Sequence, residues 1–185
     1  NLPVVPVTDI AVKGDDVVIS TQGRAFWIMD DVTPLRQLDD AVAQADRHLF
    51  TPAPAIRMGG ASFPRSNAGR NPANGAVVRY ALAEALPDSV PLTLEFLGVD
   101  GRVLRKFSRK GEVLSDTLDA LGDPVKPGVG RKLEAKAGLN SFTWDLRQPD
   151  ATSFSGIVLW GGGLEGPVVT PGDYQARLTV GKRPP

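Results

Sequence analysis

Hydrophobic and polar residues form short runs over the first thirty positions, and this pattern predicts three strands. The runs cover residues 10–13, 17–20 and 25–29. Short groups containing Gly14 and Gly23 separate them, which favours an antiparallel meander. The second and third runs are almost continuously apolar, which indicates cover on both faces of the sheet. Three strands cannot supply that cover themselves, so residues 1–32 are expected to form a blade-like β-meander that packs against another surface.

The spacing of apolar residues then changes to three and four, which predicts one helix over residues 33–49. Thr33 is expected to be its N-cap, and Pro34 suits the first helical position because it has no N–H to leave unpaired. His48 would place a favourable charge near the negative end of the helix dipole. The apolar stripe of this helix consists of Leu35, Leu38, Val42, Ala45 and Leu49.

Proline and glycine are frequent over residues 50–74 and no periodicity is present, so this segment is expected to be a connector between two domains. From 75 to 185, short alternating runs separated by turn residues predict an immunoglobulin-like β-sandwich. Asp100 and Gly101 predict a hairpin with a two-residue type I′ turn. The pattern leaves open whether residues 110–138 add a strand, a short helix or a long loop. The predicted strands are 76–82, 92–99, 102–107, 139–146, 157–160 and 174–180.

The fold class expected from these patterns is therefore mainly β: a three-stranded blade-like meander and one helix, followed by an immunoglobulin-like β-sandwich. The chain begins with Asn and has no basic-then-apolar leader, so we expect it to be a piece of a longer protein. No apolar run approaches the roughly 20 residues that span a bilayer, so no membrane span is predicted.

Composition and charge exclude several classes of partner and binding site. Lys plus Arg and Asp plus Glu number 21 each, so no net field attracts nucleic acid. The absence of cysteine excludes disulfides and thiolate-bound zinc, and His48 as the one histidine excludes a multi-histidine metal site. We therefore expect no metal, no cofactor and no nucleic-acid partner.

Three pairs of neighbouring carboxylates, at 15–16, 30–31 and 39–40, are candidates for catalysis. Neighbouring side chains on a strand point to opposite faces, whereas a glycosidase needs two carboxyl groups that face each other across a cleft. Calcium binding at 15–16 is weakened by the absence of an EF-hand loop pattern. Solvated hairpins and the approach to a helix explain the pairs better, and no catalytic residue is predicted.

Two stretches raise the question of a ligand site. In "STQGRAFWIMDD", Arg24 precedes two aromatic residues, so the stretch is either a ligand site or the turn of a repeated β-unit. Trp160 precedes three glycines and either presents an aromatic platform to a sugar or closes the core; the second interpretation is favoured. Alternation in "GLNSFTWDLRQP" places Trp144 in the core, whereas Asp145 faces the other way and can hold a turn.

The segment "DIAVKGDDVVISTQGRAFWIMDDVTPLRQL" resembles the last blade of bacterial β-propellers of the sortilin-like, bacterial-neuraminidase-repeat type. Proteins of that family are often labelled glycosyl hydrolases by similarity alone. Gln22 departs from the histidine that is commoner at its position. The residues that fit the family pattern are Gly23, Arg24, Trp27, Asp30, Asp31, Thr33, Pro34, Leu35 and Arg36.

The stretches "VDGRVLRKF", "GLNSFTWDLR" and "VVTPGDYQARLTV" are similar to the immunoglobulin-like or fibronectin-type-III-like module that follows such propellers, and to the module of flagellar hook-capping proteins. The two resemblances imply a non-catalytic structural or interaction module at the C-terminus of a larger secreted or periplasmic protein. Its partner would be the remainder of that protein or a second copy of the chain. The alternative is a carbohydrate-binding module, with Trp160 and Arg24 as the ligand-binding residues.

Overall fold

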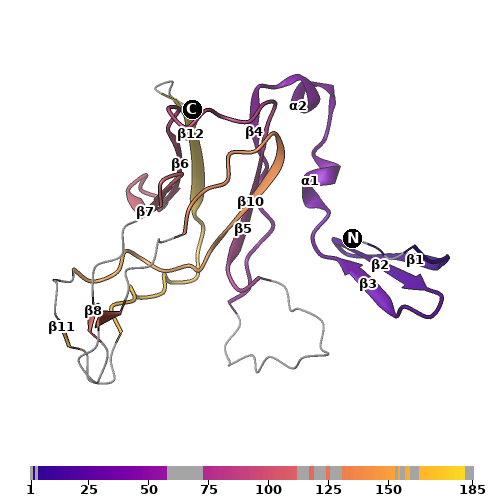
Figure 1. The fold of residues 1–185 in the computed structure, drawn as a ribbon, viewed down its shortest axis with the longest axis horizontal. Helices are drawn as coiled ribbons and strands as arrows, with labels where there is room; N and C mark the ends of the chain where they lie inside the picture. Colours follow the sequence, from indigo (N-terminus) through magenta and orange to yellow (C-terminus); the bar gives the residue numbers. More distant parts are fainter. Residues whose placement is uncertain are drawn as a thin grey trace.

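The computed structural model describes residues 2, 4–57, 73–111, 117–118, 124–125, 131–152, 154, 157–158 and 163–181. Strands dominate these residues, so the expected mainly-β class is confirmed. Figure 1 shows the N-terminal sheet standing to one side, with two short helices between it and the larger β-structure.

The N-terminal sheet consists of β1 (Val7–Lys13), β2 (Asp16–Thr21) and β3 (Phe26–Met29). They are antiparallel and follow one another in the order β1-β2-β3, so the predicted three-stranded meander is confirmed. Gly14 and Gly23 adopt positive φ angles of 61° and 74° in the two connections. Both turns therefore use the backbone freedom of glycine.

The single helix predicted over 33–49 is wrong. The segment forms α1 (Thr33–Arg36), α2 (Asp40–Gln44) and β4 (Arg47–Leu49). The Asp39 side chain accepts a hydrogen bond from the backbone N–H of Val42 at 2.7 Å, which starts a separate helix. After that helix, Ala45 is extended and the chain pairs with the sandwich, so the sheet hydrogen bonds outweigh the helical spacing of the side chains.

Two further predictions for this segment, the N-cap at Thr33 and the position of His48 near a helix end, are also wrong. The N-cap of α1 is Val32, because Thr33 already lies inside the helix. His48 lies on β4 opposite Ala81, so it does not face a helix terminus. Its ring instead contacts the ring of Phe50 edge-on, with centroids 4.7 Å apart.

Two three-stranded sheets form a β-sandwich around one core. The first has the order β10-β5-β4 and the second β12-β6-β7, and all neighbours are antiparallel. A third, small sheet has the order β11-β8-β9, so the described parts of 110–138 include strand. The strand bounds are Ala76–Leu82 (β5), Leu92–Leu97 (β6), Val103–Ser108 (β7), Thr117–Leu118 (β8), Pro124–Val125 (β9), Gly138–Trp144 (β10), Ile157–Val158 (β11) and Gln175–Val180 (β12).

The core fills the space between the two sheets. Trp144 is 1% exposed, as its place in the alternation predicts, and its ring stacks on Phe96 at a centroid distance of 4.4 Å. The Tyr80 hydroxyl donates to the carbonyl of Glu134 at 2.5 Å. Burial and the charge of Glu134 raise the pKa of Tyr80 to about 12, so the hydroxyl remains a donor. The other buried members are Val78, Leu82, Leu92, Leu94, Phe107, Leu133, Phe142, Val169 and Leu178.

The hairpin between β6 and β7 lies where it is predicted but uses a different turn. Gly101 has a φ of 76°, whereas Asp100 does not share a positive φ, so the two-residue type I′ turn is wrong. The N–H of Gly101 donates to the carbonyl of Gly98 at 2.9 Å, and the N–H of Gly98 donates to Arg102 at 3.0 Å. This pattern is typical of a three-residue loop closed by a left-handed glycine.

Candidate interaction surfaces

One face of the N-terminal sheet carries two adjacent rows of apolar side chains. Ile10, Ile19 and Trp27 are directly opposite one another across the three strands, so their side chains share a face. A second row of side chains, two residues away along each strand, lies on the same face because side chains alternate between faces with a period of two. No described residue covers this face: Ile10 is 60% exposed and Trp27 is 39% exposed. The second row consists of Val12, Val17 and Met29.

The opposite face of the same sheet is also largely apolar at its centre. Ala11, Val18 and Ile28 form one row across the strands. In the next row Phe26 is 74% exposed and lies beside two polar residues. A sheet with one solvated face would alternate apolar and polar residues, so this sheet has the pattern of one covered on both sides.

The hairpin between β2 and β3 explains the aromatic stretch. The indole N–H of Trp27 donates to the carbonyl of Arg24 at 3.0 Å. The carbonyl of Ala25, which has a φ of 62°, accepts from the hydroxyl of Thr21 at 2.8 Å. These bonds close the turn around Gly23, and the Arg24 side chain is exposed at its tip.

Asp31 lies where the N-terminal sheet ends and the sandwich begins. Its carboxylate accepts hydrogen bonds from the N–H and the hydroxyl of Thr33, at 3.1 and 2.5 Å. It also pairs with the guanidinium of Arg79 on β5. The N–H of Asp31 donates to the carboxylate of Asp16 at 3.0 Å. Asp31 therefore joins the start of β2, helix α1 and the central strand of one sandwich sheet.

The electrostatics of this site favour the ionised form of Asp31. Burial of the carboxyl group acts to raise its pKa, but the hydrogen bonds from Thr33 and Arg79 and the charge of Arg79 outweigh burial. The pKa of Asp31 is consequently below its ordinary value. The left-handed backbone of Asp31, with a φ of 59°, is one that aspartate tolerates better than most residues.

Two further contacts hold the same junction. Arg36 on α1 donates to the carboxylate of Asp15 at 2.7 Å and to the carbonyl of Gly14 at 2.8 Å. The Gln37 side-chain amide pairs with the backbone of Thr51, donating at 3.0 Å and accepting at 2.8 Å. The carboxylate pair at 15–16 thus anchors the sheet at one corner.

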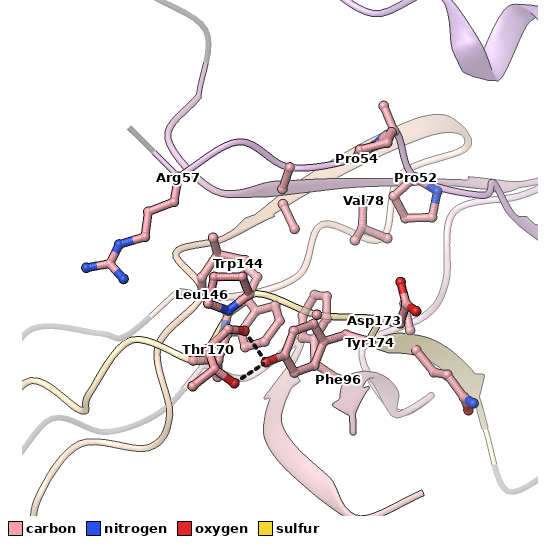
Figure 2. A pocket seen from close by; sticks show the side chains of 18 of the residues that line it. Pro52, Pro54, Arg57, Val78, Phe96, Trp144, Leu146, Thr170, Asp173 and Tyr174 are labelled. Atoms are coloured by element: carbon pink, nitrogen blue, oxygen red, sulfur yellow. Dashed lines mark hydrogen bonds between the residues drawn. The ribbon is translucent and has the colours of Figure 1, made fainter. Parts of the chain in front are cut away.

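A groove opens on one side of the sandwich. Its volume is about 510 Å³, and its walls come from residues 51–57, which follow β4, and from 169–176, which lead into β12. Figure 2 shows Trp144, Phe96 and Tyr174 gathered on one side and Pro52 and Pro54 on the other. The groove is therefore largely apolar, with aromatic rings at its base and Arg57 and Asp173 as its charged lining residues.

The residues predicted as ligand-binding do not form a described site. Arg24 lies at the hairpin tip of the N-terminal sheet, and Trp160 lies outside the described residues. Asp145 holds a turn, accepting from the N–H of Arg147 at 3.2 Å, and it pairs with Arg131 at 3.1 Å. Asp30 is exposed beside Asp31.

Sequence reasoning missed the residues that organise the junction and the groove. Arg79 and Gln37 carry no local motif, because their partners are distant in the chain. Tyr174 could have been found, since "PGDY" before a strand places a tyrosine where its hydroxyl can return to the preceding turn.

Several site classes are absent from the part of the chain that the structure describes. No group of three or more His, Asp or Glu side chains there could hold a metal ion. The helices found there are four and five residues long, and none could cross a membrane. A scan against protein-family models, a search of curated proteins and a search of solved structures each returned no match.

Proposed function

We propose that this chain is a non-catalytic structural and interaction module that contributes one blade to a larger β-propeller protein and appends a β-sandwich to it. The blade is the sheet β1–β3, and its partner is the remainder of a parent protein of the sortilin-like, neuraminidase-repeat type. The observation that supports this proposal is the exposed apolar surface of that sheet, which forms two rows on one face and the central row on the other. Propeller blades are packed on both faces by their neighbours, whereas a free sheet is not.

The junction at Asp31 supports the same proposal. Among the described residues, Arg36 joins the sheet to α1 through Asp15, and Arg79 joins it to the sandwich through Asp31, both at one end of the sheet. Both broad faces of the sheet therefore remain open to neighbours. A sheet that served only the sandwich would be expected to lay one face on the sandwich core.

Cysteine labelling tests the proposal directly, because the chain contains no cysteine of its own. Single variants Val12→Cys and Ile28→Cys place a thiol on opposite faces of the sheet, and Val99→Cys is a control at the β6–β7 hairpin. Val12 is 64%, Ile28 60% and Val99 78% exposed. All three should react quickly with a maleimide in the isolated chain.

In the full parent protein, the first two thiols should be protected and the control should still react. Equal reaction of all three positions in the parent would overturn the proposal. Titration of the chain with a panel of oligosaccharides tests the alternative: a saturable change in tryptophan fluorescence would favour a carbohydrate-binding module instead.

A further inference from the structure

Tyr174 makes a contact that identifies the position of β12 in the sandwich. Its hydroxyl donates to the backbone carbonyl of Thr170, four residues upstream, at 2.5 Å (Figure 2). A tyrosine just before a strand that bonds back in this way is the tyrosine corner of immunoglobulin-like sandwiches. In that architecture, the strand after the corner has a neighbour on each side.

Here β12 has one neighbour. It pairs with β6, and no described strand pairs with its other edge. The N–H of Gly181 donates to Pro91 at 2.8 Å, so alternate residues of β12 direct their backbone groups towards β6 and the others direct them outward. The outward set is Ala176, Leu178 and Val180.

The groove lies beside this free edge. β12 is the edge of one sheet, and β4, which residues 51–57 continue, is the edge of the other. A strand added to β12 would therefore pass beneath 51–57, with alternate side chains directed at Phe96 and Trp144. Unpaired N–H and C=O groups supply affinity for such a strand, and an apolar groove supplies selectivity.

Arg57 adds a charge preference at one end of the groove. It is exposed, its guanidinium points away from the aromatic base in Figure 2, and it has no ion-pair partner among the described residues. An antiparallel neighbour of β12 would run towards the end of the groove at Thr170. The C-terminal part of that neighbour would then approach Arg57, where a carboxylate is favoured.

We infer that the outer edge of β12 and the adjoining groove bind an extended peptide strand with alternating apolar side chains and a carboxylate at its C-terminal end. The added strand would complete the second sheet of the sandwich as its outermost member. This surface is independent of the faces of β1–β3, so it goes beyond the function proposed above, and the labelling of Val12 and Ile28 does not report on it.

Amide hydrogen exchange tests the inference residue by residue. The probe is an octapeptide of alternating threonine and valine that ends in a free aspartate, added to the full chain up to saturation. We expect exchange at Ala176, Leu178 and Val180 to slow by about tenfold or more, because their amides gain hydrogen bonds. Arg177 and Thr179 are internal controls, since their amides already face β6.

Two matched variants test the charge preference. Arg57→Gln should weaken binding of the acid-ended peptide by about two- to fivefold, the range of an exposed ion pair. It should leave an amide-ended peptide unaffected, and Arg24→Gln, at the distant hairpin tip, should change neither. An equal effect of both variants would overturn the role of Arg57.

Absence of any slowing at saturating peptide would overturn the inference, and so would equal slowing with a peptide carrying proline at alternate positions, which cannot donate the ladder bonds. Protection that grows with protein concentration alone, together with a dimer in sedimentation, would assign the edge to a second copy of the chain and overturn the peptide as its occupant.

Discussion

The carboxylate of Asp31 and the guanidinium of Arg79 form an ion pair that connects the end of the N-terminal sheet to the central strand of a sandwich sheet. The two residues are 48 positions apart, and their side chains are 20% and 19% exposed. This pair is the one direct ion pair between β5 and the 30–37 junction among the described residues. Removal of this ion pair should therefore weaken the attachment of the N-terminal sheet to the sandwich.

Asp31→Asn should lower the free energy of unfolding by about 1.5–3 kcal/mol, the range for a hydrogen bond to a charged group. Asparagine tolerates the same left-handed backbone, so the substitution keeps the backbone and removes the charge together with one of the two acceptor oxygens. Asp30→Asn is the matched control, and it should change stability by less than about 0.5 kcal/mol because the side chain is exposed. Urea denaturation measures both; equal midpoints would contradict a role for the ion pair.

The contribution of Asp31 should also depend on pH. Its pKa is below the ordinary value of 3.8 in the folded chain, so the folded state binds fewer protons than the unfolded state near that pH. The stabilisation is present above the ordinary pKa and is lost as pH falls through the lowered one. Thermal melting of the wild type and Asp31→Asn should converge as pH falls below about 4. A constant difference down to pH 2 would argue against this linkage.

Glu95 should behave in the same direction at the other end of the molecule. Burial acts to raise its pKa, but hydrogen bonds from Arg177 and Lys106 outweigh it and leave the pKa below the ordinary 4.5. Arg177 donates to Glu95 at 2.9 Å across β12 and β6. Glu95→Gln should therefore destabilise the sandwich at neutral pH and much less in acid. NMR titration of the carboxyl carbons would measure the two lowered pKa values directly.

Gly75 should be intolerant of any side chain. A Cβ atom there would lie 2.1 Å from the carbonyl oxygen of Trp144, and the residue has a φ of 138°. Both the contact and the backbone conformation oppose Gly75→Ala, and we expect a loss of about 2 kcal/mol or more. Gly172→Ala is the control, because a Cβ atom at that position meets nothing within 4 Å. Thermal unfolding of the two variants should differ clearly.

The apolar face of the N-terminal sheet should bind hydrophobic dyes in the isolated chain. Replacing Ile10 and Val12 with threonine keeps the strand propensity and removes apolar surface. Dye fluorescence should fall, with stability changed by less than about 0.5 kcal/mol. The same double replacement at Val99 and Leu139, which are 78% and 57% exposed on the sandwich, is the control. Equal loss of dye signal in both variants would mean that the sheet face is not the dye site.

The strands were predictable where a local pattern decides the structure. Alternation and turn glycines located β1–β3, and the run from 76 to 82 coincides with β5. The segment 33–49 was not predictable, because its last residues gain hydrogen bonds from β5 that lie outside the local sequence. The helical spacing of five apolar residues carries no information on this competing pairing of β4 with β5.

The organisation of the surfaces was less predictable than the strands. The aspartate pair at 30–31 was expected to be structural, yet its partner Arg79 cannot be identified from spacing. The walls of the groove come from two segments that are distant in the chain, 51–57 and 169–176. Only the tertiary pairing brings Arg57 beside the turn that contains Thr170.

The attachment of the sheet at one corner has a consequence for any assembly that contains it. The hydrogen bonds of Asp31, Arg36 and Gln37 restrain the chain on both sides of α1. The connection between the sheet and the sandwich is therefore not a flexible linker. If the sheet packs between other sheets in an assembly, these hydrogen bonds set the direction in which the sandwich projects. The free edge of β12 would then have a fixed orientation and a fixed distance relative to the rest of the assembly.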